Sequence, residues 1–130
     1  MPTVMIVDDE ELIRSMIRKS LIRIGYNVLE AENGNEAMKI VETEHIDMII
    51  SDLVMPEKGG IELMMELKNL FPNIKKIAIS GKLPTENKSI SDLAERFNVD
   101  AVFSKPFELF DLLKVVKKLV PAAGSSANEM

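Results

Sequence analysis

The chain contains neither cysteine nor tryptophan among its 130 residues. Without cysteine it can form no disulfides and offers no thiolate ligands to a metal, so a reducing cytoplasm is the expected compartment. Its apolar runs are far too short to cross a bilayer, and no long apolar core follows a basic start at the amino terminus. The sequence therefore predicts neither a membrane protein nor a secretory signal.

Basic residues are also in short supply. Sixteen Lys and Arg residues face twenty-one Asp and Glu residues, which gives a net charge of −5. This charge repels phosphate backbones, and no basic stripe alternates with aromatic residues, so direct binding to nucleic acid is not expected. Neither a G-x-G-x-x-G motif nor a P-loop follows any expected strand, which argues against a nucleotide-binding module.

The chain does have a regular alternation of short runs rich in Val, Ile and Met with longer segments whose apolar residues lie three or four apart. This pattern is typical of βαβ units, so the expected fold class is α/β with a doubly wound parallel sheet of five strands. The expected strands are 3–7, 27–31, 47–51, 74–80 and 101–104. The expected helices are 10–24, 34–44, 60–71, 86–97 and 107–119, with ends indicated by Gly25, Asn33, Pro72 and Thr85.

The length suits one domain with a proper core, which we place at residues 1–120. Residues 121–130 are small and polar and have no periodicity, so they are expected to form a disordered tail. Both a stand-alone protein and a piece cut before an effector domain agree with this pattern.

Polar residues follow the expected strands at their carboxyl ends, where ligands of doubly wound sheets gather. Asp8 and Asp9 follow the first strand, and Asp52 follows the third. If these strands are neighbours, the three carboxylates lie close together and raise one another's pKa unless a cation intervenes. An all-oxygen set without His or Cys selects a hard ion, and room for water and a phosphoryl oxygen favours Mg²⁺.

Two further residues complete this edge. Ser80 follows the fourth strand and supplies a hydroxyl, and Lys105 follows the fifth and supplies a movable positive charge. A carboxylate attacks phosphorus and forms an aspartyl phosphate when a metal and a lysine neutralise the transferring group. Because Asp52 stands alone while Asp8 and Asp9 are paired like metal ligands, Asp52 is the expected phosphoacceptor.

Each of these residues also has a simpler interpretation when it is taken alone. Acidic residues after a strand often only cap the next helix, and we expect Glu10 and Glu11 to do no more than that. Ser80 alone would be a turn residue and Lys105 a solvated loop residue. The functional interpretation depends on their joint occurrence at successive strand ends.

Four motifs stand in order along the chain: IVDDE, SDLVMPEKGG, AISG and FSKPF. They resemble the receiver domain of two-component response regulators, over about residues 3–120. The resemblance implies a flavodoxin-like (βα)5 three-layer sandwich with the strand order 2-1-3-4-5. It also implies that a sensor histidine kinase or a histidine phosphotransfer protein supplies a phosphoryl group, which the domain transfers to its own Asp52 with Mg²⁺ bound.

The resemblance implies a role for each site residue. Asp9, Asp52 and the backbone carbonyl of Val54 would be direct ligands of Mg²⁺, and Asp8 would help through water. Lys105 would contact the phosphoryl group, with a cis peptide bond before the proline that follows it. Ser80 would turn towards the phosphoryl group after transfer.

One departure from the family pattern concerns the residue that acts as a switch in the family. Family members usually carry Phe or Tyr three residues before the lysine as a rotating switch, and here that residue is Val102. Phe103 then points to the other side of its strand and is expected in the core. Output would depend on the loop after Ser80 and on the fourth helix.

The first expected helix has an unusually broad apolar arc that includes Leu12 and Met16. One edge of it is therefore either exposed, where kinases and phosphotransfer proteins of this family dock, or part of a broad core face. The output partner is not identified by any residue, and the resemblance also allows a dimer that forms on phosphorylation.

Two other functions remain as alternatives. The first is a Mg²⁺-dependent phosphohydrolase with an aspartyl-phosphate intermediate, but such enzymes typically carry a second acid where this chain has Val54. The second is a pseudo-receiver scaffold that ignores phosphate, and it should have lost at least one of the five strand-end residues. None of the five is missing, which disfavours the scaffold, and Val54 disfavours the phosphohydrolase. The domain is expected to catalyse only its own phosphorylation and dephosphorylation.

Overall fold

A computed structural model describes residues 1–53, 59–80 and 98–122 of the protein. The described part contains a five-stranded parallel sheet in the order β2-β1-β3-β4-β5, so the predicted fold and strand order are confirmed. The strands are β1 (Thr3–Val7), β2 (Asn27–Ala31), β3 (Met48–Asp52), β4 (Lys75–Ser80) and β5 (Ala101–Ser104). The helices are α1 (Glu11–Arg23), α2 (Gly34–Thr43), α3 (Gly60–Leu70) and α5 (Leu109–Leu119). The helix expected at 86–97 lies outside the described residues.

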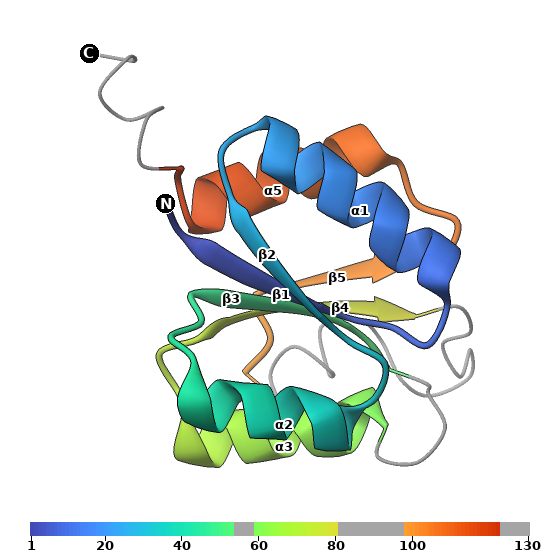
Figure 1. The fold of residues 1–130 in the computed structure, drawn as a ribbon. Coiled ribbons are helices and arrows are strands. Elements are labelled where there is room, and N and C mark those ends of the chain that lie inside the picture. The colour runs from blue at the N-terminus through green and yellow to red at the C-terminus, as the bar shows by residue number, and fades with distance from the viewer. Residues whose placement is uncertain (54–58, 81–97, 123–130) are drawn as a thin grey trace.

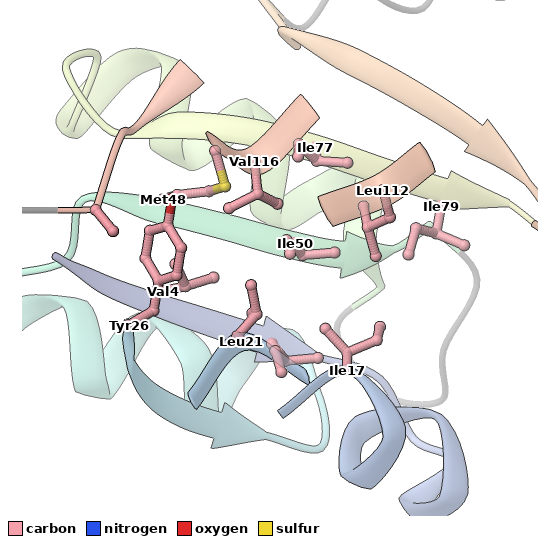
Figure 2. Close-up of a cluster of buried hydrophobic side chains, with 12 residues drawn as sticks. Val4, Ile17, Leu21, Tyr26, Met48, Ile50, Ile77, Ile79, Leu112 and Val116 are labelled. Carbon is pink, nitrogen blue, oxygen red and sulfur yellow. The ribbon is translucent and has the colours of Figure 1, made fainter. Parts of the chain in front are cut away.

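The helices cover both faces of the sheet, with α1 and α5 on one side and α2 and α3 on the other (Figure 1). On the α1 and α5 side, side chains of β1, β3 and β4 interdigitate with Leu21, Leu112 and Val116 of the helices (Figure 2). A second cluster fills the α2 and α3 side. Every residue of β3 is buried, as expected for a central strand that is covered on both faces.

Helix ends follow the local signals. The side-chain oxygen of Asn33 accepts the N–H of Glu36 at 2.9 Å, which caps α2 as predicted. Gly25 follows α1 with φ = 102°, a conformation that side chains disfavour. The last helix begins at Leu109, two residues later than predicted, and Phe107 before it packs edge-on to Phe103 with ring centroids 6.2 Å apart.

The carboxyl end of the described chain is packed against the turn that precedes β2. The hydroxyl of Tyr26 donates to the carbonyl of Val120 at 2.6 Å, and Ala122 is buried in the same cluster. Ala122 therefore belongs to the packed domain, although the sequence placed it in the tail that was expected from 121. Residues 123–130 lie outside the described part. None of the described helices has the length and hydropathy that a membrane span needs.

Candidate functional site

The pairing of β1 with β3 creates the site. Val7, the last residue of β1, lies opposite Ser51 in parallel register, so the residues that follow meet at one edge. Asp8 comes directly after β1 and is 2% exposed, and Asp52 ends β3 and is 5% exposed. Asp9 is exposed at the same edge. The sequence predicted this meeting from the βα alternation, and the register produces it.

Four carboxylates share this edge: Asp8, Asp9, Glu10 and Asp52. Each can place one carboxylate oxygen within 4.8 Å of the others. A donor set made only of carboxylate oxygens suits a hard divalent cation, and few carboxylates with room for water suit Mg²⁺. The donor chemistry of these residues therefore fits the metal that the sequence indicated.

Glu10 was missed by the sequence analysis, which assigned it only to the start of a helix. Helix α1 does begin after it, but the described contacts include no capping bond from its side chain. Instead Glu10 Oε1 lies 3.0 Å from Lys105 Nζ, and the Glu10 N–H donates to Asp8 Oδ1 at 2.8 Å. That part of the prediction was wrong, because the partner that draws the carboxylate into the site is 95 residues away in the chain.

Lys105 lies among these acids. Its Nζ is 3.0 Å from Asp52 Oδ2 and 3.4 Å from Asp8 Oδ2, in addition to its contact with Glu10. The backbone places it there, because the Lys105 N–H donates to the carbonyl of Ser80 at 2.8 Å and the next peptide bond is cis, as predicted. Burial alone would lower the pKa of Lys105, but the hydrogen bonds to Glu10 and Asp52 and the charges of Asp8 and Asp52 raise it above its ordinary value. The ammonium therefore stays charged.

The charge on Asp8 is less well compensated. Burial raises the pKa of its carboxyl, and the negative charge of Asp52 adds to the rise. The N–H of Glu10 and the ammonium of Lys105 lower this pKa, but the sum remains above the ordinary value. Lys105 and the Glu10 N–H therefore do not offset the burial of this carboxylate and the charge of Asp52, and a divalent cation beside it would favour the ionised form.

Two predicted site residues remain, Ser80 and Val54. Ser80 ends β4, is 2% exposed and lies opposite Ser104 of β5, so it belongs to the same edge of the sheet. Its carbonyl holds the backbone of Lys105. Val54, predicted to offer its backbone carbonyl to the metal, lies outside the described residues.

Val102 and Phe103 point to opposite faces of β5. Val102 lies opposite Ala78 and packs with a small cluster that includes Met64 of α3. Phe103 packs on the α1 and α5 face, next to Phe107. Phe103 faces away from Val102 as predicted, and it is partly buried where it packs against the core cluster. The position of the family's aromatic switch is filled by a small aliphatic side chain.

Comparison with known sequences gives a consistent result. Residues 4–117 match the family model described as response regulator receiver domain. The chain is 32% identical over 124 residues to the response regulator receiver protein CpdR of Brucella abortus (strain 2308), covering 95% of this chain and 100% of that protein. It is also 37% identical over 81 residues to the autoinducer 1 sensor kinase/phosphatase LuxN of Vibrio campbellii (strain ATCC BAA-1116). That match covers 62% of this chain but only 10% of LuxN.

Solved structures agree. A CheY-like receiver domain protein from Methanospirillum hungatei JF-1 has a TM-score of 0.83 and 30% identity, with 91% of this chain and 92% of that one covered. TrrA from Thermotoga maritima, solved with Mg(2+)-BeF, has a TM-score of 0.80 and 32% identity, with 92% and 100% covered. A response regulator from Burkholderia pseudomallei, solved with a phosphorylated aspartic acid, a calcium ion and citrate, has a TM-score of 0.75 and 26% identity, with 99% and 73% covered.

The fold, the acidic edge and these comparisons agree over almost the whole described chain. The chain belongs to the response regulator receiver domain family and is a receiver domain of a two-component phosphorelay.

Proposed function

We propose that Asp52 is the phosphoacceptor of this receiver domain and that Asp9, Asp52 and the backbone carbonyl of Val54 bind Mg²⁺, with Asp8 helping through water. The observation that carries the proposal is the ammonium of Lys105, 3.0 Å from Asp52 Oδ2 inside a cluster of four carboxylates. When bound, Mg²⁺ supplies positive charge that stabilises the transferring phosphoryl group. The Mg(2+)-BeF complex of TrrA and the phosphorylated aspartic acid of the Burkholderia protein support the assignment.

The transfer itself needs few groups. A carboxylate oxygen of Asp52 attacks the phosphorus of a phosphohistidine, the new O–P bond forms as the P–N bond breaks, and the imidazole nitrogen keeps the electron pair. Lys105 then moves its ammonium from the carboxylate to the phosphoryl oxygens, with which it forms charge-assisted hydrogen bonds. Ser80, on the neighbouring strand end, turns its hydroxyl towards the same oxygens.

The phosphoryl donor is a sensor histidine kinase or a histidine phosphotransfer protein that docks beside the acidic edge. Leu12 is 85% exposed and Met16 is 40% exposed, both on the helix that starts at this edge. These exposed apolar side chains support docking on α1, one of the two alternatives that the sequence left open. We assign the receiver function to the predicted domain, residues 1–120, with Ala122 packed against it, and we propose the cytoplasm as its location. The output partner and a phosphorylation-dependent dimer stay predictions.

The direct experiment is to incubate the protein with Mg²⁺ and acetyl phosphate and to measure the intact mass. We expect an adduct of one phosphoryl group that hydroxylamine removes and that Asp52→Asn lacks. Asp111→Asn, which changes an exposed aspartate of α5 outside the acidic edge, is the matched control and should retain the adduct. An adduct that survives Asp52→Asn, or no adduct with any phosphoryl donor, would overturn the proposal.

A further inference from the structure

The connection between β1 and α1 carries Asp8 and Asp9, and a side chain of α1 holds its backbone. Arg14 Nη1 donates to the carbonyl oxygen of Asp8 at 2.6 Å, and Arg14 Nε donates to Glu30 Oε1 at 3.1 Å. The Arg14 side chain is only 11% exposed. A single guanidinium therefore ties the start of the acidic edge to β2, the strand on the far side of β1.

Glu30 is a firm anchor for this guanidinium. It lies in β2 opposite Ile6 of β1, and its second oxygen accepts a hydrogen bond from Arg18 Nη1 at 2.7 Å. Burial would raise the pKa of Glu30, but the hydrogen bonds and charges of Arg18 and Arg14 lower it below its ordinary value. The carboxylate therefore stays ionised, and its two oxygens are divided between the two arginines.

Besides its contact with Lys105, Asp8 makes three hydrogen bonds of different origin. Its N–H donates to the carbonyl of Ala31 at 3.1 Å, which continues the ladder between β1 and β2. Its Oδ1 accepts the N–H of Glu10 at 2.8 Å, and its carbonyl accepts from Arg14. The bonds to Ala31 and from Arg14 fix the peptide planes on either side of Asp8, and of the two only the bond from Arg14 can be removed by changing a side chain.

We propose that Arg14, braced by Glu30, is a positioning residue for the metal: it fixes the backbone of Asp8 and Asp9 so that their carboxylates converge on Asp52. The inference rests on the proposed function, because it concerns Mg²⁺ at that site. Groups that orient metal ligands without touching the metal typically change its affinity when they are removed. Arg14 acts through the backbone of Asp8 and is not itself a ligand.

A purely electrostatic role and a positioning role of Arg14 predict opposite changes in Mg²⁺ affinity when Arg14 is replaced. Removing a positive charge close to a cation site would strengthen cation binding if charge alone mattered. Loss of positioning weakens binding, because the ligands must then be ordered at the moment the ion arrives. A weaker affinity after Arg14→Met therefore indicates positioning and cannot come from the charge change.

The test is calorimetric titration of the full chain with MgCl₂, for the wild-type protein, Arg14→Met and Arg18→Met. Arg18→Met is the matched control, because Arg18 has the same charge, the same helix and the same partner, Glu30, but its described contacts do not include Asp8. We expect Arg14→Met to weaken Mg²⁺ binding about tenfold. Arg18→Met should change it by less than about twofold.

Amide hydrogen exchange of Glu10, measured without Mg²⁺, gives a second result that does not depend on the metal. Arg14→Met should accelerate this exchange and Arg18→Met should not, because the Glu10 N–H is bonded to the residue that Arg14 holds. If Arg14→Met fails to fold, Glu30→Gln replaces it in the exchange measurement, which contains no Mg²⁺ and is therefore free of the charge effect on metal binding. Faster exchange of the Glu10 amide is again expected, because Arg14 then loses the charged partner that holds it.

The failures can be told apart. A wild-type protein that binds no Mg²⁺ contradicts the proposed function, and the exchange of the Glu10 amide still decides whether Arg14 holds the connection. Wild-type binding that Arg14→Met retains or strengthens overturns the positioning role. Equal weakening by Arg14→Met and Arg18→Met overturns it as well, because the effect then follows the charge network and not the contact with Asp8.

Discussion

Two lysines at opposite edges of the same sheet meet opposite electrostatic surroundings. Lys76 lies near the amino end of β4, is 1% exposed, and donates from Nζ to the carbonyl of Ile74 at 3.0 Å. Burial lowers its pKa, and the charge of Asp100 only partly offsets this. Lys105 lies at the carboxyl edge, where carboxylates of three residues approach its ammonium and raise its pKa.

The decisive difference between the surroundings of Lys105 and those of Lys76 lies in the carboxylates around them. Burial disfavours the charged form of both lysines, so burial alone does not create an ionic centre. The difference comes from the carboxylates that parallel strands bring to one edge, since Asp8 follows β1 and Asp52 ends the neighbouring strand β3. The carboxyl edge therefore brings together several charged groups that can act on a ligand, whereas at the amino edge the burial of Lys76 is only partly compensated.

We expect the largest change, a slower phosphorylation, when Lys105 and not Lys76 is replaced. Lys105→Met removes the cation that would stabilise the phosphoryl group, so we expect phosphorylation by acetyl phosphate to slow about 100-fold. Lys76→Met should leave this rate unchanged, because Lys76 lies at the other edge. The rates follow from intact mass at timed intervals, and equal rates for the two variants would remove the distinction.

The second prediction compares a Gly→Ala substitution at the carboxyl edge, Gly60→Ala, with one at the amino edge, Gly25→Ala. A Cβ on Gly60 would lie 2.0 Å from the carbonyl oxygen of Asp52 and 2.7 Å from Cα of Leu53, and backbone atoms cannot give way. Gly60→Ala should therefore destabilise the fold by about 3 kcal/mol and displace Asp52 from Lys105, with loss of most phosphorylation.

Gly25→Ala is the control, because it strains a left-handed residue far from the acidic edge. It should cost roughly 1 kcal/mol and leave phosphorylation intact. Urea unfolding gives the free energies, and phosphorylation is measured well below the unfolding midpoint. Normal phosphorylation of Gly60→Ala would contradict the close contact between α3 and Asp52.

The third prediction concerns pH at the amino edge. The pKa of Lys76 is lower in the folded protein than in the unfolded chain. Just below the ordinary lysine pKa of about 10.4, the unfolded chain therefore binds more protons than the folded protein. In that pH range the free energy of unfolding rises with pH. Lys76→Met should be about 1 kcal/mol more stable than the wild type at neutral pH. This advantage should shrink as pH approaches about 10. Urea unfolding at both pH values tests it, and a constant difference would show that Lys76 does not titrate differently in the folded protein.

The smallest effect is expected for Glu10→Gln. Glu10 is 59% exposed, so solvent screens its ion pair with Lys105, and the free energy of unfolding should change by less than about 0.5 kcal/mol. The phosphorylation rate should change by no more than about threefold, since Asp8 and Asp52 still hold Lys105. A tenfold loss of Mg²⁺ affinity would instead make Glu10 an indispensable ligand.

The sequence predicted the sheet and the meeting of Asp8 with Asp52 because both follow from local patterns. Apolar runs give the strands, and parallel pairing brings their carboxyl ends to one edge. The two cap signals at Gly25 and Asn33 were also correct, since they depend only on neighbouring residues.

What the sequence missed depends on contacts between distant residues. Glu10 enters the site through Lys105, and Arg14 reaches the carbonyl of Asp8 only after α1 packs against β2. Ala122 looked like part of a polar tail, but it is buried against the turn at Gly25. None of these contacts has a periodic or motif signal, so only the folded arrangement reveals them.

The central claim is that Asp52 alone carries the phosphoryl group, and the most direct test is to map it. Borohydride reduces an aspartyl phosphate to homoserine, which tandem mass spectrometry locates in the peptide. After treatment with acetyl phosphate and Mg²⁺, we predict homoserine at position 52. Homoserine in place of Asp8 or Asp9, or a phosphate that resists reduction on Ser80, would contradict the account.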